Sequence, residues 1–160
     1  MTLLFGKYRG AVAANTDPML MGRVQVTAPA ALGSAAVWAL PCAPFAGSGV
    51  GFFVVPPVGA NVWVEFEGGN PDFPIWSGCF WGVGEWPASM ALPQMLVVKT
   101  QTATLTLNDL PGVGGVTIQT ADGKKIAISA TGIEIDDGAG GVVSLQGPKV
   151  TVNNGALEVT

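Results

Sequence analysis

Every aromatic side chain of this 160-residue chain lies within its first 86 residues. The sequence holds five Trp, seven Phe and one Tyr, and the last of these rings is Trp86. The first part therefore has large side chains for a core, whereas the remainder offers only aliphatic side chains and Met. We expect two modules, residues 1–86 and residues 96–160, joined by a linker at residues 87–95.

Composition excludes several function classes. Half of the chain is apolar (49%) and only 11% is charged, well under the roughly 25% of ordinary soluble domains, so a disordered chain is not expected. The net charge of −4 disfavours nucleic acid as a partner, because few cations are present to neutralise phosphates. The absence of histidine excludes Ser-His-Asp triads and imidazole metal sites. We expect no enzymatic activity, no metal and no cofactor.

The first module has the pattern of a small all-β barrel. Strand candidates end at Gly, Pro, Asn or Asp turns, and no helical amphipathic window is present. Five short strands with aromatic interiors favour an oligonucleotide/oligosaccharide-binding (OB) barrel, with a small sandwich as the alternative. The candidate strands are residues 7–14, 21–27, 36–42, 61–67 and 75–81.

The second module repeats one short pattern, in which two apolar residues stand at positions i and i+2 around a mostly polar residue. Such spacing places both apolar side chains on the same face of a strand. Gly-containing turns, such as Asp122-Gly123 and Asn154-Gly155, separate the strands. The pairs are Leu96/Val98, Leu105/Leu107, Val116/Ile118, Ile126/Ile128, Ile133/Ile135, Val143/Leu145, Val150/Val152 and Leu157/Val159.

These strands carry too little apolar surface to hold a sheet together alone, because one aliphatic side chain contributes only about 1.5 to 3 kcal/mol on full burial. Several identical chains that point their aliphatic rows at one axis would bury them. We expect three chains with many interchain strand hydrogen bonds, forming a trimeric β-helix or β-prism. A single-chain β-solenoid and hairpins packed on the first module remain alternatives. The predicted axis residues are Val116, Ile118, Ile126, Ile128, Ile133, Ile135, Val143, Leu145, Val150 and Val152.

The first module also resembles a known family. Gly22-Arg23-Val24-Gln25-Val26, Trp38-Ala39-Leu40-Pro41, the block from Gly49 to Asp72 and Pro74-Ile75-Trp76-Ser77-Gly78 occur in the order seen in central spike proteins. These are the needles of contractile phage tails (baseplate assembly protein V), of type VI secretion (the VgrG proteins) and of extracellular contractile injection systems. The resemblance spans nearly all of residues 5–82, and the repeats that follow are similar to the family's trimeric β-helix.

The resemblance implies a homotrimeric, non-enzymatic spike that pierces a target envelope and contacts that envelope transiently. It implies a separate hub protein at the barrel end and a PAAR-type tip protein at the C-terminal end, with Leu157 and Val159 contacting the tip. No secretory signal is visible at residues 1–10, so we expect synthesis in the cytoplasm and assembly into the baseplate of a phage or injection particle.

Other functions stay open at this stage. Glu65 and Glu67 would lie on one strand face and serve a wall hydrolase. An OB module that binds nucleic acid or glycan would have a stacking platform of Trp76, Phe80, Trp81 and Trp86. A receptor-binding tail fibre is a further alternative. We expect free thiols at Cys42 and Cys79, and an ordinary turn rather than a calcium site at residues 136–141.

Overall fold

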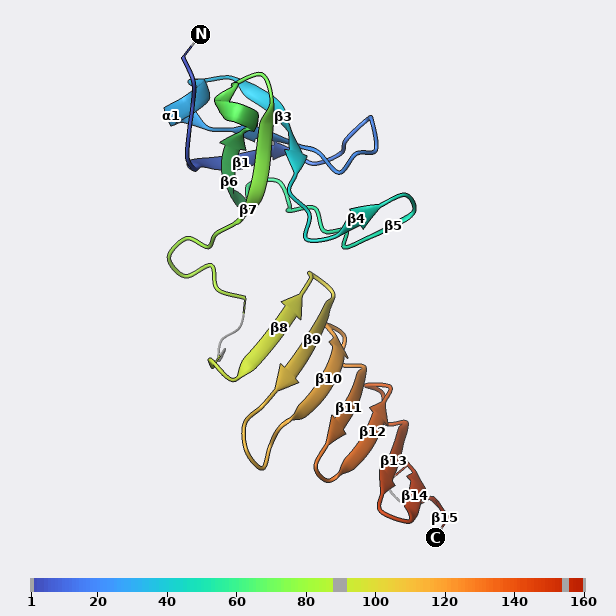
Figure 1. Cartoon of the computed structure of the whole chain (residues 1–160). Coiled ribbons are helices and arrows are strands. Elements are labelled where there is room, and N and C mark those ends of the chain that lie inside the picture. Colours follow the sequence, from blue (N-terminus) through green and yellow to red (C-terminus); the bar gives the residue numbers. More distant parts are fainter. Residues whose placement is uncertain (1, 88–91, 154–155, 160) are drawn as a thin grey trace. The chain divides into compact units, whose positions relative to one another are not determined.

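The computed structural model describes residues 2–87, 92–153 and 156–159, with no side-chain description for residues 158 and 159. The chain divides into two compact units, Met1–Glu85 and Trp86–Thr160. Apart from a single α-helical turn and one 3-10 turn, its described regular structure is β (Figure 1).

The first unit is a closed barrel of five strands, as expected for an OB-type domain. Its order is β1-β2-β3-β7-β6, and β1 also pairs with β6 to close the ring. All pairs are antiparallel except β3 with β7. The strands are β1 (Tyr8–Ala14), β2 (Val24–Thr27), β3 (Ala36–Pro41), β6 (Asn61–Phe66) and β7 (Pro74–Cys79).

The barrel core is built from small side chains, not from the rings that the sequence led us to expect. Phe66 is the one aromatic residue among the eight fully buried apolar residues of the described chain, and Phe53 and Trp81 are more than half exposed. A five-stranded barrel has a narrow interior, which valine fills without strain. The buried residues are Val12, Val24, Val26, Ala28, Ala39, Val62, Val64 and Phe66.

Short elements decorate the barrel. A single helical turn, α1 (Pro29–Leu32), follows β2, and the 3-10 turn η1 (Glu67–Gly69) follows β6. A small hairpin of β4 (Ala46–Gly47) and β5 (Val50–Gly51) extends from the loop between β3 and β6. Across the described residues, no helix has the length and apolarity required to cross a membrane.

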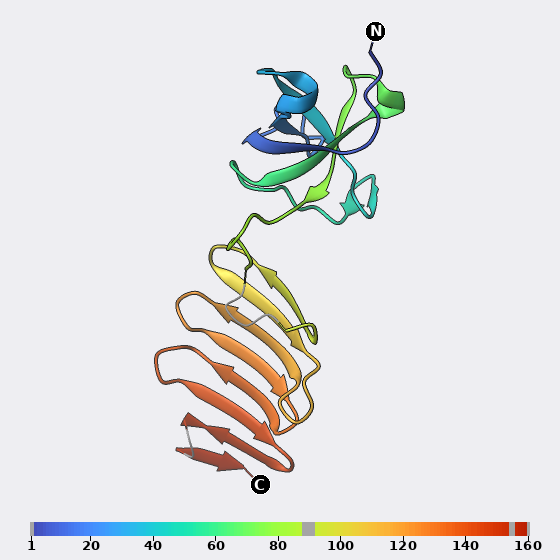
Figure 2. The ribbon, with the colours of Figure 1, turned by 90° about the vertical axis from the view of Figure 1, so that its left-hand side faces the viewer.

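The second unit is one antiparallel sheet of eight strands in which each strand pairs with the next along the chain (Figure 2). Each predicted apolar pair lies in its own strand. The strands are β8 (Met95–Lys99), β9 (Ala103–Asn108), β10 (Gly115–Thr120), β11 (Lys125–Ser129), β12 (Gly132–Asp136), β13 (Val142–Gln146), β14 (Lys149–Val152) and β15 (Leu157–Val159).

The ladder hydrogen bonds of this sheet form within one chain, whereas we expected many of them between chains. Tight turns, such as the one between β11 and β12, bring consecutive strands into register. Short loops favour hairpins because closing a short loop costs little entropy. Any association with sister chains therefore uses side chains of a sheet that is already hydrogen-bonded.

Candidate functional site

The register of the second unit aligns its apolar residues across all eight strands. In the β10–β11 pair, Val116 lies opposite Ile128 and Ile118 lies opposite Ile126. The next pair continues the pattern, with Ile126 opposite Ile135. Directly paired residues project from the same face of a sheet, so these side chains stack from strand to strand.

Two parallel columns result, and together they form what we call the aliphatic face. The first column contains Leu96, Leu107, Val116, Ile128, Ile133, Leu145 and Val150, and the backbone of Val159 continues it. The second column contains Val98, Leu105, Ile118, Ile126, Ile135, Val143, Val152 and Leu157. The structure thus brings all ten predicted axis residues together. It also adds the pairs of β8 and β9, which the predicted axis omitted although they have the same spacing.

The aliphatic face is uncovered within one chain. No described residue between 92 and 153 is fully buried, and Ile118 and Ile128 are each 49% exposed. A continuous uncovered apolar surface over eight strands is uncommon on a monomeric protein and marks an interaction surface. Leu157, predicted to contact a tip protein, is 60% exposed at the C-terminal end of the same face. The side chain of Val159, its predicted companion, lies outside the described residues.

The opposite face of the sheet is mostly polar, as the alternation predicts, with Val97 and Ala127 among its apolar members. Thr106, Thr117 and Ser144 occupy its central row, and an ion pair of 2.7 Å joins Lys125 to Glu134. This carboxylate raises the pKa of the Lys125 ammonium. Both side chains are partly exposed, so the pair contributes little to stability. Because one face is apolar and the other is polar, the sheet has a defined inner side.

The acidic turn between β12 and β13 uses its carboxylates internally. The Asp137 carboxylate accepts hydrogen bonds from the backbone amides of Ala139 at 2.7 Å and Gly141 at 2.9 Å, which lowers the pKa of Asp137. Asp136 accepts one from Gly138 at 2.8 Å. Among the described parts of the chain, no cluster of three or more His, Cys, Asp or Glu side chains has the geometry to hold a metal ion.

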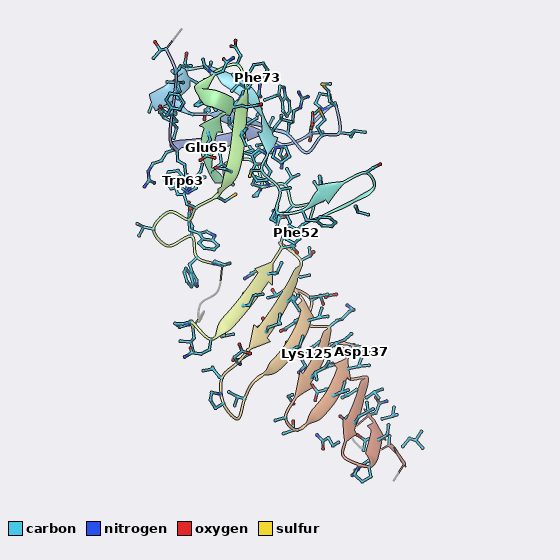
Figure 3. All side chains as sticks on the ribbon, viewed as in Figure 1. Phe52, Trp63, Glu65, Phe73, Lys125 and Asp137 are labelled. Carbon is cyan, nitrogen blue, oxygen red and sulfur yellow. The ribbon has the colours of Figure 1, made fainter. Side chains whose placement is uncertain are left out.

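The two glutamates of the barrel do not form a matched pair. Glu65 lies in β6 (Figure 3). It makes a 2.8 Å ion pair with Lys7, and this ammonium lowers the pKa of Glu65. Glu67 already belongs to η1, because β6 ends at Phe66. The expected strand 61–67 thus ends one residue earlier, and only Glu65 of the two lies in it. The lowered pKa of Glu65 favours its carboxylate form.

Two half-buried aromatics of the barrel, Trp63 and Phe80, contact each other. Trp63 and Phe80 stack with ring centroids 4.6 Å apart, and the Arg9 guanidinium lies 5.2 Å from the Trp63 ring and 4.8 Å from Phe80. Trp76 packs against the barrel core. The platform proposed for base stacking is thus divided: Phe80 is covered by a cation, and Trp76 packs inward.

Comparison with known families also finds two domains in the chain, one in each structural unit. Residues 8–81 match the type VI secretion system/phage-baseplate injector OB domain, and residues 95–158 match the phage baseplate V C-terminal trimerisation domain. No curated protein matches the chain. An OB barrel followed by a trimerisation sheet defines a structural component of a phage or type VI secretion baseplate.

The chain belongs to the phage baseplate V family. Its C-terminal unit is a self-association domain, and its role is structural and related to the spike of the baseplate. The resemblance to the spike family is thereby confirmed, as is the all-β fold with an OB barrel first.

Proposed function

We propose that three copies of this chain form the central spike of a contractile phage tail or a related injection system, attached to a hub and driven through a target envelope when the sheath contracts. The observation that carries the proposal is the aliphatic face, which extends over eight strands with no cover from its own chain. A baseplate protein with such a face needs sister chains to bury it.

Three sheets arranged as a triangular prism would bury this face at a common axis. The interior of such a prism is narrow, so it accepts Val and Ile but not rings, and the described part of the second unit has no ring beyond Trp86. Burying one of these side chains contributes about 1.5 to 3 kcal/mol. The proposed axis residues are Val116, Ile118, Ile126, Ile128, Ile133, Ile135, Val143, Leu145, Val150 and Val152, preceded by the pairs of β8 and β9.

The proposed mechanism is mechanical. Each inner strand is hydrogen-bonded to both neighbours within its chain, and a dry axis would exclude the water that competes for those bonds. Opening one strand then requires breaking two ladders and exposing apolar surface to water. The spike would transmit an axial load as one body, without a catalytic step.

The proposed partners follow from the family resemblance. The barrel would attach to a hub protein, and the C-terminal end, with Leu157 exposed on β15, would carry a PAAR-type tip protein. Val159 is proposed as the second tip contact. Contact with the target envelope would be transient, and nucleic acid is not a proposed partner. We propose assembly into the baseplate after synthesis without a secretory signal.

Cryo-electron microscopy of assembled particles tests this role. We expect threefold density for the chain on the central axis, and we expect particles carrying Ile126→Lys to lack that density and to fail in envelope penetration. Thr117→Lys adds the same charge to the polar face and is the matched control, expected to retain both. Density at the particle periphery would instead identify a receptor-binding fibre and would refute the spike role.

A further inference from the structure

The loop between β1 and β2 presents apolar side chains to solvent. Met19 is 64% exposed and Leu20 is 93% exposed. Leu20 also has a φ of 55°, a left-handed conformation that costs free energy for a residue with a branched side chain. The fold therefore holds an apolar residue outward at an energetic cost, with no contact inside the barrel to offset it.

An ionic clasp fixes this loop. The Asp17 carboxylate accepts hydrogen bonds from the backbone amides of Met19 at 3.0 Å and Met21 at 2.8 Å. It also binds the Arg23 guanidinium, with Nη2 at 2.8 Å and Nε at 3.1 Å, and its side chain is only 5% exposed. One carboxylate thus binds backbone amides on both sides of Leu20 and the guanidinium that follows the loop.

A second apolar segment surrounds the β4–β5 hairpin. Phe45, Phe52 and Phe53 are 59%, 61% and 79% exposed. Val50, within this segment, and Val54, directly after it, are also exposed. No charged residue occurs between Arg23 and Glu65. Surface loops are ordinarily rich in polar side chains, so this loop has the composition of an interface.

The two segments lie side by side on the barrel. A Cβ on Gly22 would stand 3.6 Å from the Phe53 ring, and the Asn15 side-chain amide donates a 3.1 Å hydrogen bond to the Pro56 carbonyl. Figure 1 shows the β1–β2 loop and the β4–β5 hairpin on the same side of the barrel. We call Met19, Leu20, Phe45, Phe52 and Phe53 the apolar loop surface.

We infer that the apolar loop surface binds the barrel of a second copy of this chain, so that the barrels form their own contact within the trimer. The inference rests on the proposed trimer. Ten peptide steps separate Glu85, the end of the barrel unit, from Met95, where β8 begins. An extended chain spans at most about 3.6 Å per residue, so each barrel stays within about 36 Å of its own sheet. Three barrels held that closely meet at a high effective concentration.

The charge distribution favours a sister barrel over a foreign protein. Contacts repeated around a symmetry axis bring identical groups near one another, and like charges there would repel. The only charges in the β1–β2 loop region, Asp17 and Arg23, neutralise each other. A surface without net charge is compatible with three identical neighbours, whereas partners that differ commonly use charge complementarity.

Distance measurement between barrels tests the inference on the full chain. The label is attached at Ser48→Cys, in the exposed hairpin turn, in a chain that also carries Cys42→Ser and Cys79→Ser. Pulsed dipolar electron spin resonance is expected to give one narrow distance distribution. The variant Leu20→Asn/Phe52→Ser/Phe53→Ser is expected to widen that distribution at least twofold. Asn tolerates the left-handed conformation at position 20, and the two Phe are exposed. The barrel of this variant is therefore expected to stay folded, which tryptophan fluorescence checks.

Phe73→Ser is the matched control. Phe73 is 55% exposed and is placed by Figure 3 away from Phe52 on the barrel, so the distribution is expected to stay narrow. Sedimentation of every sample separates the two proposals. If the chain is a trimer but the distances between labels are broadly distributed with unaltered loops, the barrel contact alone is refuted. The same holds if the triple variant keeps a narrow distance distribution. A monomer refutes both. A distribution that narrows only on addition of a hub protein assigns the surface to the hub and also refutes the inference.

Discussion

Ile126 in β11 lies directly opposite Ile135 in β12, and the two side chains are 44% and 47% exposed although they are neighbours in a regular sheet. Cross-strand contact alone leaves nearly half of each side chain in water. Each of the eight strands has at least one apolar side chain on this face that is 36% exposed or more. The match to a trimerisation domain supports self-association, and we expect sister chains to bury this surface.

A charge on the aliphatic face is expected to abolish self-association. Ile126→Lys would place an ammonium among apolar side chains from three chains, and loss of a buried Ile alone costs about 2 to 5 kcal/mol per site. Sedimentation velocity should show the variant as a smaller species than the unaltered chain. Thr117→Lys, on the polar face, should sediment like the unaltered chain, and equal loss of association in both variants would contradict the assignment of the inner face.

The barrel is expected to be sensitive to small changes in its valine core. Val64 is 0% exposed, so Val64→Ala removes two methyl groups from a closed interior and should lower the free energy of unfolding by about 2 to 3 kcal/mol. Denaturant unfolding followed by tryptophan fluorescence reports mainly on this unit, because four of the five Trp residues lie in it and the fifth is Trp86. Val83→Ala, at a fully exposed position, should stay within about 0.5 kcal/mol of the unaltered chain.

The Asp17–Arg23 clasp predicts a pH dependence of barrel stability. The guanidinium and the backbone amides lower the pKa of Asp17 well below its ordinary value. In the unfolded chain the pKa of this carboxyl is about 3.9. The unfolded state therefore binds a proton more readily than the folded state. The contribution of Asp17 is therefore complete above about pH 4 to 5 and is lost as pH falls toward the lowered folded value.

Unfolding measured at neutral pH and at successively lower pH values checks this sign. Asp17→Asn should be less stable than the unaltered chain at neutral pH and should lose less stability on acidification. If the difference in free energy of unfolding between the two proteins does not shrink as pH falls below 4, the clasp is not the source of the pH dependence.

Gly132 is expected to be essential for the β12–β13 pairing. A Cβ at this position would lie 2.0 Å from the Leu145 carbonyl oxygen, and its φ is 145°. Gly132→Ala should therefore force the strands apart and lower the free energy of unfolding by more than about 3 kcal/mol. Gly140→Ala is the control, because Gly140 has a positive φ of 109° but no atom within 4 Å of the added carbon.

Thermal unfolding followed by circular dichroism measures the two glycine variants. Gly140→Ala should cost about 1 to 3 kcal/mol through backbone strain alone. The steric account fails if Gly132→Ala unfolds at the same temperature as that control.

The elements of this fold were predictable from local patterns, because short strands with turns leave a clear alternation. The predicted ends of strands were wrong where one residue changes the path of a loop. Residues 21–23 appear as strand in the sequence, but Asp17 gathers the amides of Met21 and Arg23, so β2 begins only at Val24. Similarly, Gly68 adopts a φ of 57° and ends β6 before Glu67.

The register and the place of the aromatic rings were not predictable in the same way. Sliding one strand by two residues preserves the alternation, so only the turns and the pairing of Ile126 with Ile135 define the two columns. A ring in a five-stranded barrel was expected inside, yet Phe52 and Phe53 are exposed. The interior is already filled by Val24, Val26 and Val62, which sequence alone does not reveal.

The mass of the purified full-length chain in solution tests the central claim most directly. Sedimentation equilibrium or native mass spectrometry should give a single species of three times the 16.3 kDa chain mass, stable on dilution. A stable species of 16.3 kDa with the second unit folded would show that the aliphatic face needs no sister chains, and the account of a trimeric spike would be wrong.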